Sequence, residues 1–228
     1  MRTRLYVDIT QCDFDKFVDF LFAPVVQPES ARRDRWYFNT RVSFDPNRVC
    51  GYYVHLFRNA GFLLERYSRG QLEQGFGAIQ VRSLCCSVRQ IMWHRDLPFS
   101  DREECVRSIF HFCRDIFRHD AFEFTASMWW DSFCFDWECG NRRRSRGGED
   151  LLMQDVLFGT LSRVLLIDSS ICRGSALHGL EHLHHPETMV LIGGVIQSHP
   201  ELAEQLTGYA DVIRGRDPLW MRSAKPGD

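Results

Sequence analysis

The chain has 228 residues, which is enough for one domain with a substantial core or for two helical halves that share a core. Hydrophobic residues make up 44% and charged residues 25% of the chain, ordinary values for a globular protein that exclude a disordered one. The net charge of −2 at pH 7 gives no general attraction to nucleic acid or to anionic membranes, so neither is an expected partner.

Apolar residues at helical spacing predict a first helix over residues 13–23, which Pro24 ends. The following polar stretch is turn-rich, and the aromatic segment 36–44 can be extended. Asp45 followed by Pro46 predicts the start of the next helix, because Asp is a favoured N-cap residue and Pro suits the first helical position.

Two capping boxes, in which a Ser bonds reciprocally with a Glu or Gln three residues later, predict further helix starts. They are Ser68 with Gln71 and Ser100 with Glu103, with a short helix over 83–93 between them. The first of these helices contains Gly75 and Gly77, which permit close packing of a neighbour. The second runs to Phe117 with strong 3.6-residue periodicity, and its wide apolar arc predicts a central helix.

Residues 122–137 are dense in aromatic side chains, most of which the helical spacing places in the core. Trp130 occupies another side, where, if exposed, it would anchor a protein partner, because Trp is enriched at binding hot spots. Asp131, Asp136 and Glu138 could supply paired carboxylates in this segment, although carboxylates in such numbers usually solvate a helix surface.

The segment CGNRRRSRGG, residues 139–148, is called the Arg loop below. Four Arg between glycines predict an exposed, mobile loop. It is either a solvated linker between two helical regions or a loop that binds an anion or an acidic partner. The candidate contact residues are Arg142, Arg143, Arg144 and Arg146.

The last third contains four predicted helices with short joints, over residues 149–166, 170–184, 187–197 and 201–214. Short joints force neighbouring helices to run antiparallel. This third, residues 149–214, resembles HEAT-type helical repeats, and its stretch SALHGLEHL is similar to the second helix of such a repeat. The resemblance implies a HEAT-like or α-solenoid-like arrangement of the C-terminal third.

The sequence thus predicts an all-α fold, a multi-helix array of antiparallel α-hairpins. The expected divisions are an N-terminal helical region over 1–138, the Arg loop over 139–148, a C-terminal helical-hairpin region over 149–215 and a tail over 216–228. The two helical regions are expected to share one core, and Trp220 of the tail can dock back onto it.

The helix over 170–184 presents two different faces. At about 100° of rotation per residue, its apolar side carries Ala176, Leu180 and Leu183, and Gly179 between them lets a neighbouring helix come close. Three histidines, His178, His182 and His185, gather on the opposite side. They are predicted to be structural or solvent-facing and available to a partner.

His178, Glu181 and His182 also spell H-x-x-E-H, which resembles the motif of one class of zinc peptidases. The resemblance implies that the two histidines bind zinc, that Glu181 is the general base and that a further acidic ligand comes from elsewhere in the chain. Nearby downstream candidates such as Glu187 and Glu201 lie too close in sequence to match that class.

The nine cysteines include no C-x-x-C pair, and the N-terminal residues lack the apolar core of a signal peptide. They predict reduced, largely buried thiols in a cytoplasmic protein. No apolar run approaches the roughly 20 residues of a membrane-spanning helix, so membrane insertion is not expected.

Two functions remain after these exclusions. The preferred one is a non-catalytic cytoplasmic protein–protein interaction module without a cofactor, a role that bacterial regulatory adaptors, immunity proteins and defence-associated proteins fill with small helical scaffolds. Its contacts are predicted at the Arg loop, at Trp130 and at the histidine face. The alternative is a zinc-dependent hydrolase that uses His178 and His182 as ligands and Glu181 as base.

Overall fold

The computed structural model describes residues 5–28, 35–119 and 122–208, and over these residues the protein is mostly helical. The helix predicted from residue 201 onward begins with the 3₁₀ helix η7 and is described to residue 208. The tail over 216–228, including Trp220, lies outside the described residues.

The elements of the N-terminal part are short helices and two strands. In chain order they are β1 (Leu5–Asp8), α1 (Phe14–Phe22), η2 (Trp36–Phe38), β2 (Thr40–Ser43), α2 (Pro46–Arg58), η3 (Ala60–Phe62), α3 (Leu63–Arg66), α4 (Arg69–Gln80) and α5 (Val88–Ile91). The remaining elements are α6 (Phe99–Phe112), the π-helical turn η4 (Cys113–Phe117), α7 (Glu123–Ser127), α8 (Asp131–Glu138), η6 (Arg144–Arg146), α9 (Gly148–Leu165), α10 (Ser170–Leu183), α11 (Thr188–Ser198) and η7 (Pro200–Leu202).

Several helices begin at the predicted capping residues. The Asp13 side chain accepts from the backbone N–H of Lys16 at the start of α1, and that of Asp45 accepts from two backbone N–H groups at the start of α2. Both halves of the capping box of Ser68 and Gln71 are formed before α4. The predictions at Asp45 and at Ser68 are confirmed, and the cap at Asp13 was not predicted; all three depend on bonds between residues that are close in sequence.

The second predicted capping box is wrong. Helix α6 begins at Phe99 and follows Pro98, so Ser100 already lies inside its first turn and its hydroxyl contacts Asp101 instead. The helix predicted over 83–93 is also shorter than expected, because only Val88–Ile91 is α-helical there.

A small sheet at the N-terminal end was not predicted. β1 and β2 pair in parallel over four residues each, with Leu5 opposite Thr40 and Asp8 opposite Ser43. The extended part of the predicted segment 36–44 is therefore confined to β2. Strands this short carry too few alternations for the period-2 signal to be read from sequence.

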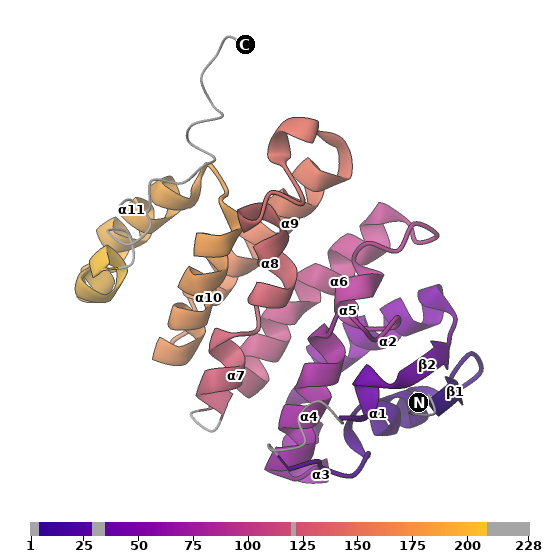
Figure 1. The fold of residues 1–228 in the computed structure, drawn as a ribbon. Coiled ribbons are helices and arrows are strands. Elements are labelled where there is room, and N and C mark those ends of the chain that lie inside the picture. The colour runs from indigo at the N-terminus through magenta and orange to yellow at the C-terminus, as the bar shows by residue number, and fades with distance from the viewer. Residues whose placement is uncertain (1–4, 29–34, 120–121, 209–228) are drawn as a thin grey trace.

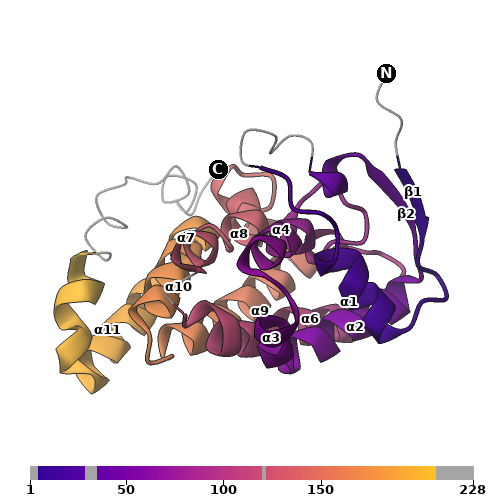
Figure 2. The ribbon, with the colours of Figure 1, turned by 90° about the horizontal axis from the view of Figure 1, so that it is seen from below.

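The main helices follow one another across the molecule. α6 lies between α2 and α9, and α10 packs against α9 and α8 (Figure 1). In the turned view, α7, α8 and α4 lie along one side of the row formed by α2, α6, α9 and α10 (Figure 2). α6 thus occupies the central position that its wide apolar arc predicts.

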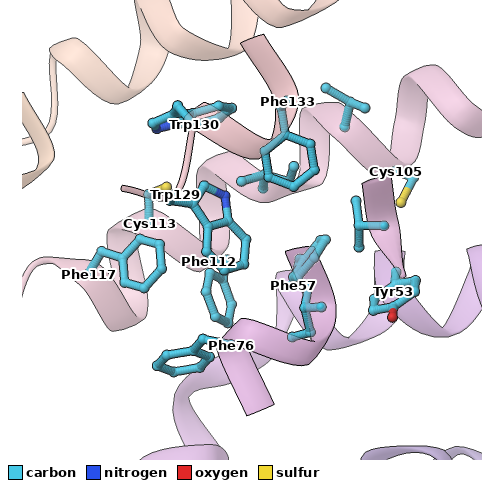
Figure 3. Packing of buried hydrophobic residues seen from close by; sticks show 14 of the residues in the cluster. Tyr53, Phe57, Phe76, Cys105, Phe112, Cys113, Phe117, Trp129, Trp130 and Phe133 are labelled. Carbon is cyan, nitrogen blue, oxygen red and sulfur yellow. The ribbon is translucent and has the colours of Figure 1, made fainter. Parts of the chain in front are cut away.

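One cluster of buried hydrophobic side chains extends from Ile9 to Leu206, with members on both sides of the Arg loop. Its centre is aromatic (Figure 3). The ring of Phe112 in α6 lies within 5.3 Å, centroid to centroid, of the rings of Phe57, Phe76, Phe117 and Trp129. α6 and the segment before α8 are therefore fixed against each other.

Glycine at two positions of α4 allows close packing, as predicted. A Cβ at Gly75 would clash with the ring of Phe22, and one at Gly77 would lie 2.7 Å from the hydroxyl of Tyr37. All nine cysteines are free thiols, and most are buried. Within the described part of the chain, no helix has both the length and the apolar character needed to cross a bilayer.

Candidate metal centre

α10 carries the histidines, and its start and its apolar side follow from local sequence. The Ser169 hydroxyl accepts from the backbone N–H of Cys172 and caps the helix. Ala176, Leu180 and Leu183 are buried, as the helical spacing predicts. A Cβ at Gly179 would lie 2.7 Å from Leu161 and 2.8 Å from Trp130, so glycine lets α9 and the start of α8 approach α10 closely.

α8 supplies carboxylates to the same place. Asp131 is its first residue and Glu138 its last, and their separation of two helical turns puts both on the side that faces α10. Because Trp130 is fully buried against α10 (Figure 3), Asp131 is held at the edge of the interface between the two helices.

Three ligand-type atoms converge between these helices. Asp131 Oδ1 lies 2.7 Å from His178 Nε2 and 3.4 Å from His182 Nε2. The two Nε2 atoms lie 3.3 Å apart. Two imidazole nitrogens and one carboxylate oxygen are therefore directed at a common point, an arrangement typical of a divalent metal site.

Each histidine has a carboxylate on its other nitrogen. Glu138 Oε2 contacts His182 Nδ1, and Glu181 Oε2 lies 3.9 Å from His178 Nδ1. A carboxylate that accepts from the second ring nitrogen orients a metal-binding imidazole. Glu181 is thus behind His178 relative to the convergence point, which is not where the peptidase resemblance would place a general base.

The cluster is half-buried at the edge of the α8–α10 interface. The His182 side chain is 10% exposed, whereas those of His178 and Asp131 are 27% and 30% exposed. The prediction that these histidines face solvent is therefore wrong for His182, whose ring makes an edge contact with the ring of Phe135. His178 and Asp131 leave one side of the cluster open to solvent.

His185 is buried away from this cluster and has a structural role. Its Nε2 donates to Asp155 Oδ1 at 2.9 Å, its Nδ1 accepts from the backbone N–H of Glu187, and its ring stacks on Phe158. Burial lowers the pKa of His185, and nearby Arg144 adds to this effect. The prediction that His185 is available to a partner is wrong.

Trp130 is also unavailable as an interface anchor, because it is fully buried. The chain turns at Met128–Trp130 between α7 and α8, and Trp130 packs against Phe133 and close to the backbone of Gly179. The exposed aromatic side chains of this segment are instead Phe124 and Phe135, at 72% and 47% exposure.

The Arg loop is held by internal contacts. Arg142 Nη1 donates to Asp150 at 2.8 Å while its guanidinium lies over the ring of Trp93, and Arg144 pairs with Asp155. Arg143 and Arg146 remain exposed. Arg142 and Arg144 are therefore already bonded to carboxylates within the fold, contrary to the prediction of an exposed loop with four cations available to a partner.

The sequence resemblance supplied two of the three converging groups and left the third unidentified. That group is Asp131, which lies upstream of the motif and not downstream of it. The sequence did contain one signal for it. Asp131 and Glu138 are seven residues apart, about two helical turns, so a helix places both carboxylates on the same face.

Comparisons with protein-family models, with curated proteins and with solved structures find no match to this chain. Its functional interpretation therefore depends on the geometry above.

Proposed function

We propose that this protein binds one divalent transition metal ion, with zinc as the best fit, through Asp131 Oδ1, His178 Nε2 and His182 Nε2. The observation that carries the proposal is the convergence of these three atoms, all within 4.8 Å of one another, from two packed helices. Imidazole nitrogen and carboxylate oxygen are the donors that zinc takes in sites with three protein ligands, where water fills the fourth position.

The carboxylates behind the histidines support a binding role more than a hydrolytic one. Glu138 contacts His182 Nδ1 and so would orient that ligand, and Glu181 lies on the Nδ1 side of His178 at 3.9 Å. A base for hydrolysis must reach a water molecule on the other side of the imidazoles. The preferred function is therefore a non-catalytic helical protein whose folded state is stabilised by the ion.

The test is metal binding by protein purified without a histidine tag and stripped with a chelator. Titration calorimetry and elemental analysis should give one zinc per chain. Asp131→Asn keeps the shape of the side chain and removes its charge, and it should weaken binding by roughly 100-fold or more, since a ligand is lost. His199→Ala is the matched control, because the His199 side chain is 48% exposed and pairs with the exposed Glu201.

Metal should also stabilise the folded state. At a zinc concentration 100 times Kd the gain is about 2.7 kcal/mol, equivalent to an increase in Tm of roughly 5–11 °C for a chain of this length. Absence of binding by the wild-type chain, or equal loss in Asp131→Asn and His199→Ala, would contradict the proposal.

A zinc-dependent hydrolase with Glu181 as base stays as the alternative. It predicts that zinc-loaded protein cleaves an unstructured substrate such as casein, and that Glu181→Gln abolishes cleavage while metal remains bound. Cleavage with this dependence would replace the non-catalytic proposal.

We also propose that the helices form a HEAT-like array that contacts a protein partner in the cytoplasm. The support is a set of three exposed apolar side chains in one segment, Phe124, Met128 and Phe135, of which Phe135 contacts His182. Because aromatic side chains are enriched at interfaces, replacing Phe124 and Phe135 with Ser should leave the fold intact and remove a partner that co-purifies with the wild-type chain. A wild-type chain that stays alone in lysate would count against this role.

A further inference from the structure

A polar cleft that shares no residue with the candidate metal centre lies where α2, α6 and α9 meet. Its volume is about 310 Å³, and it is lined by a mixture of cations and carboxylates. The charged and titratable groups are Arg58, Glu103, Glu104, Arg107, His111 and Arg163. Three guanidinium groups from three helices face two carboxylates, which leaves one positive charge in excess.

Arg163 of α9 is the cation without a carboxylate. Its guanidinium lies over the ring of Phe110, 4.0 Å from the centroid. Among the residues that the structure describes, no Asp or Glu lies within ion-pair distance of it. A guanidinium held over an aromatic ring in this way keeps N–H groups that can still donate to phosphate or carboxylate oxygens.

The other two arginines are held loosely. Arg58 pairs with Glu104 at 2.9 Å and Arg107 with Glu103 at 2.7 Å. The four side chains are 33% to 52% exposed. Exposed pairs of this kind contribute little to stability, so both arginines can turn toward another anion at small cost. Gly159 adds room, because a Cβ there would lie 3.3 Å from Arg107 Nη1.

His111 reports the electrostatic potential in the cleft. Burial lowers its pKa, and the positive charges of Arg114, Arg163 and Arg58 lower it further, against an opposing effect of Asp115. The histidine is thus in a positive field, which an anion bound in the cleft would reduce.

We propose that this cleft binds the phosphate group of a small anionic ligand between Arg58, Arg107 and Arg163. Three guanidinium groups arriving from different helices suit a dianion with several oxygens better than a single carboxylate. The cleft is larger than one phosphate ion, so both free phosphate and the phosphate group of a monoester fit. The proposal is independent of the metal centre, which shares none of these residues.

The test uses the full chain stripped of metal, at pH 7 and low salt, with inorganic phosphate and phenyl phosphate as separate probes. Binding is followed by the NMR signal of the His111 ring and by calorimetry. Saturable binding of either probe, with a rise in the pKa of His111 on saturation, is the expected result. Tighter binding of phenyl phosphate would indicate a monoester ligand, and equal or tighter binding of inorganic phosphate would indicate the free ion.

Arg163→Gln should weaken binding by roughly tenfold or more, because a charge-assisted hydrogen bond is lost. Arg143→Gln, which neutralises an exposed cation in the Arg loop, is the matched control and should have little effect. Asp131→Asn should also leave phosphate binding unchanged. No saturable change at His111 with either probe, or equal weakening by Arg163→Gln and Arg143→Gln, would overturn the proposal.

Discussion

Gly179→Ala tests whether close approach of two helices positions the candidate metal centre. A Cβ at this position would lie 2.7 Å from Leu161 Cδ2 and 2.8 Å from Trp130 Cβ. Each of these contacts is shorter than real Cβ atoms adopt. Gly179 directly follows His178, and Trp130 directly precedes Asp131, so any displacement separates the two ligand-bearing residues.

The expected cost follows from two opposing effects. Leu161 can move its terminal methyl group, but Trp130 Cβ is attached to the backbone, so α8 and α10 must shift. Overpacking of this kind costs about 1–3 kcal/mol. Replacing glycine with alanine inside a helix returns about 1 kcal/mol. The net loss of stability at Gly179 is therefore about 0–2 kcal/mol, and zinc affinity should fall because the two helices shift.

Gly174→Ala is the matched control in the same helix. Nothing lies within 4 Å of a Cβ at Gly174, so only the gain in helix propensity applies and the variant should be more stable than the wild type by up to about 1 kcal/mol. Urea unfolding of both metal-free variants measures the difference. If Gly179→Ala proves as stable as Gly174→Ala and binds zinc equally well, the close contact does not position the site.

Two further predictions concern buried charges. Glu149 binds both terminal nitrogens of the buried Arg102 guanidinium, at 2.6 and 3.0 Å, so Glu149→Ala leaves this charge without its carboxylate. The variant should lose about 1–3 kcal/mol of stability in urea unfolding. This is less than a fully buried pair would lose, because the Glu149 side chain is 51% exposed. Arg102→Met should cost less, since water can solvate the remaining carboxylate. His185 has a lowered pKa and is favoured in its neutral form by the fold, so its contribution is complete above about pH 6.5 and is lost as the pH falls toward its folded-state pKa. His185→Gln should remove that part of the pH dependence of unfolding, and an unchanged profile would contradict this assignment.

Features set by neighbours in sequence could be predicted, and features set by long-range pairing could not. The N-caps Asp13, Asp45 and Ser169 and the capping box of Ser68 depend on bonds that span only two or three residues, and all are formed. The sheet of β1 and β2 joins segments about 35 residues apart, and no local pattern in four-residue strands indicates which segments pair.

The candidate site shows the same division within one cluster. His178 and His182 lie one helical turn apart, so the helix alone brings them together and the sequence suffices to find them. Asp131 joins them only through the packing of α8 on α10, a contact across 47 residues that no local pattern indicates.

The arrangement of charges gives a physical reason for a cation at this point. Two Nε2 atoms 3.3 Å apart cannot both donate to each other, and one carboxylate oxygen lies close to both. Glu138 and Glu181 add two more carboxylates on the far sides of the rings. Three carboxylates around two imidazoles form an anionic surrounding for a cation, and a metal ion is the ligand that satisfies both Nε2 atoms and Asp131 at once. A cluster selected only for packing would gain more from apolar side chains, which avoid the cost of removing these groups from water.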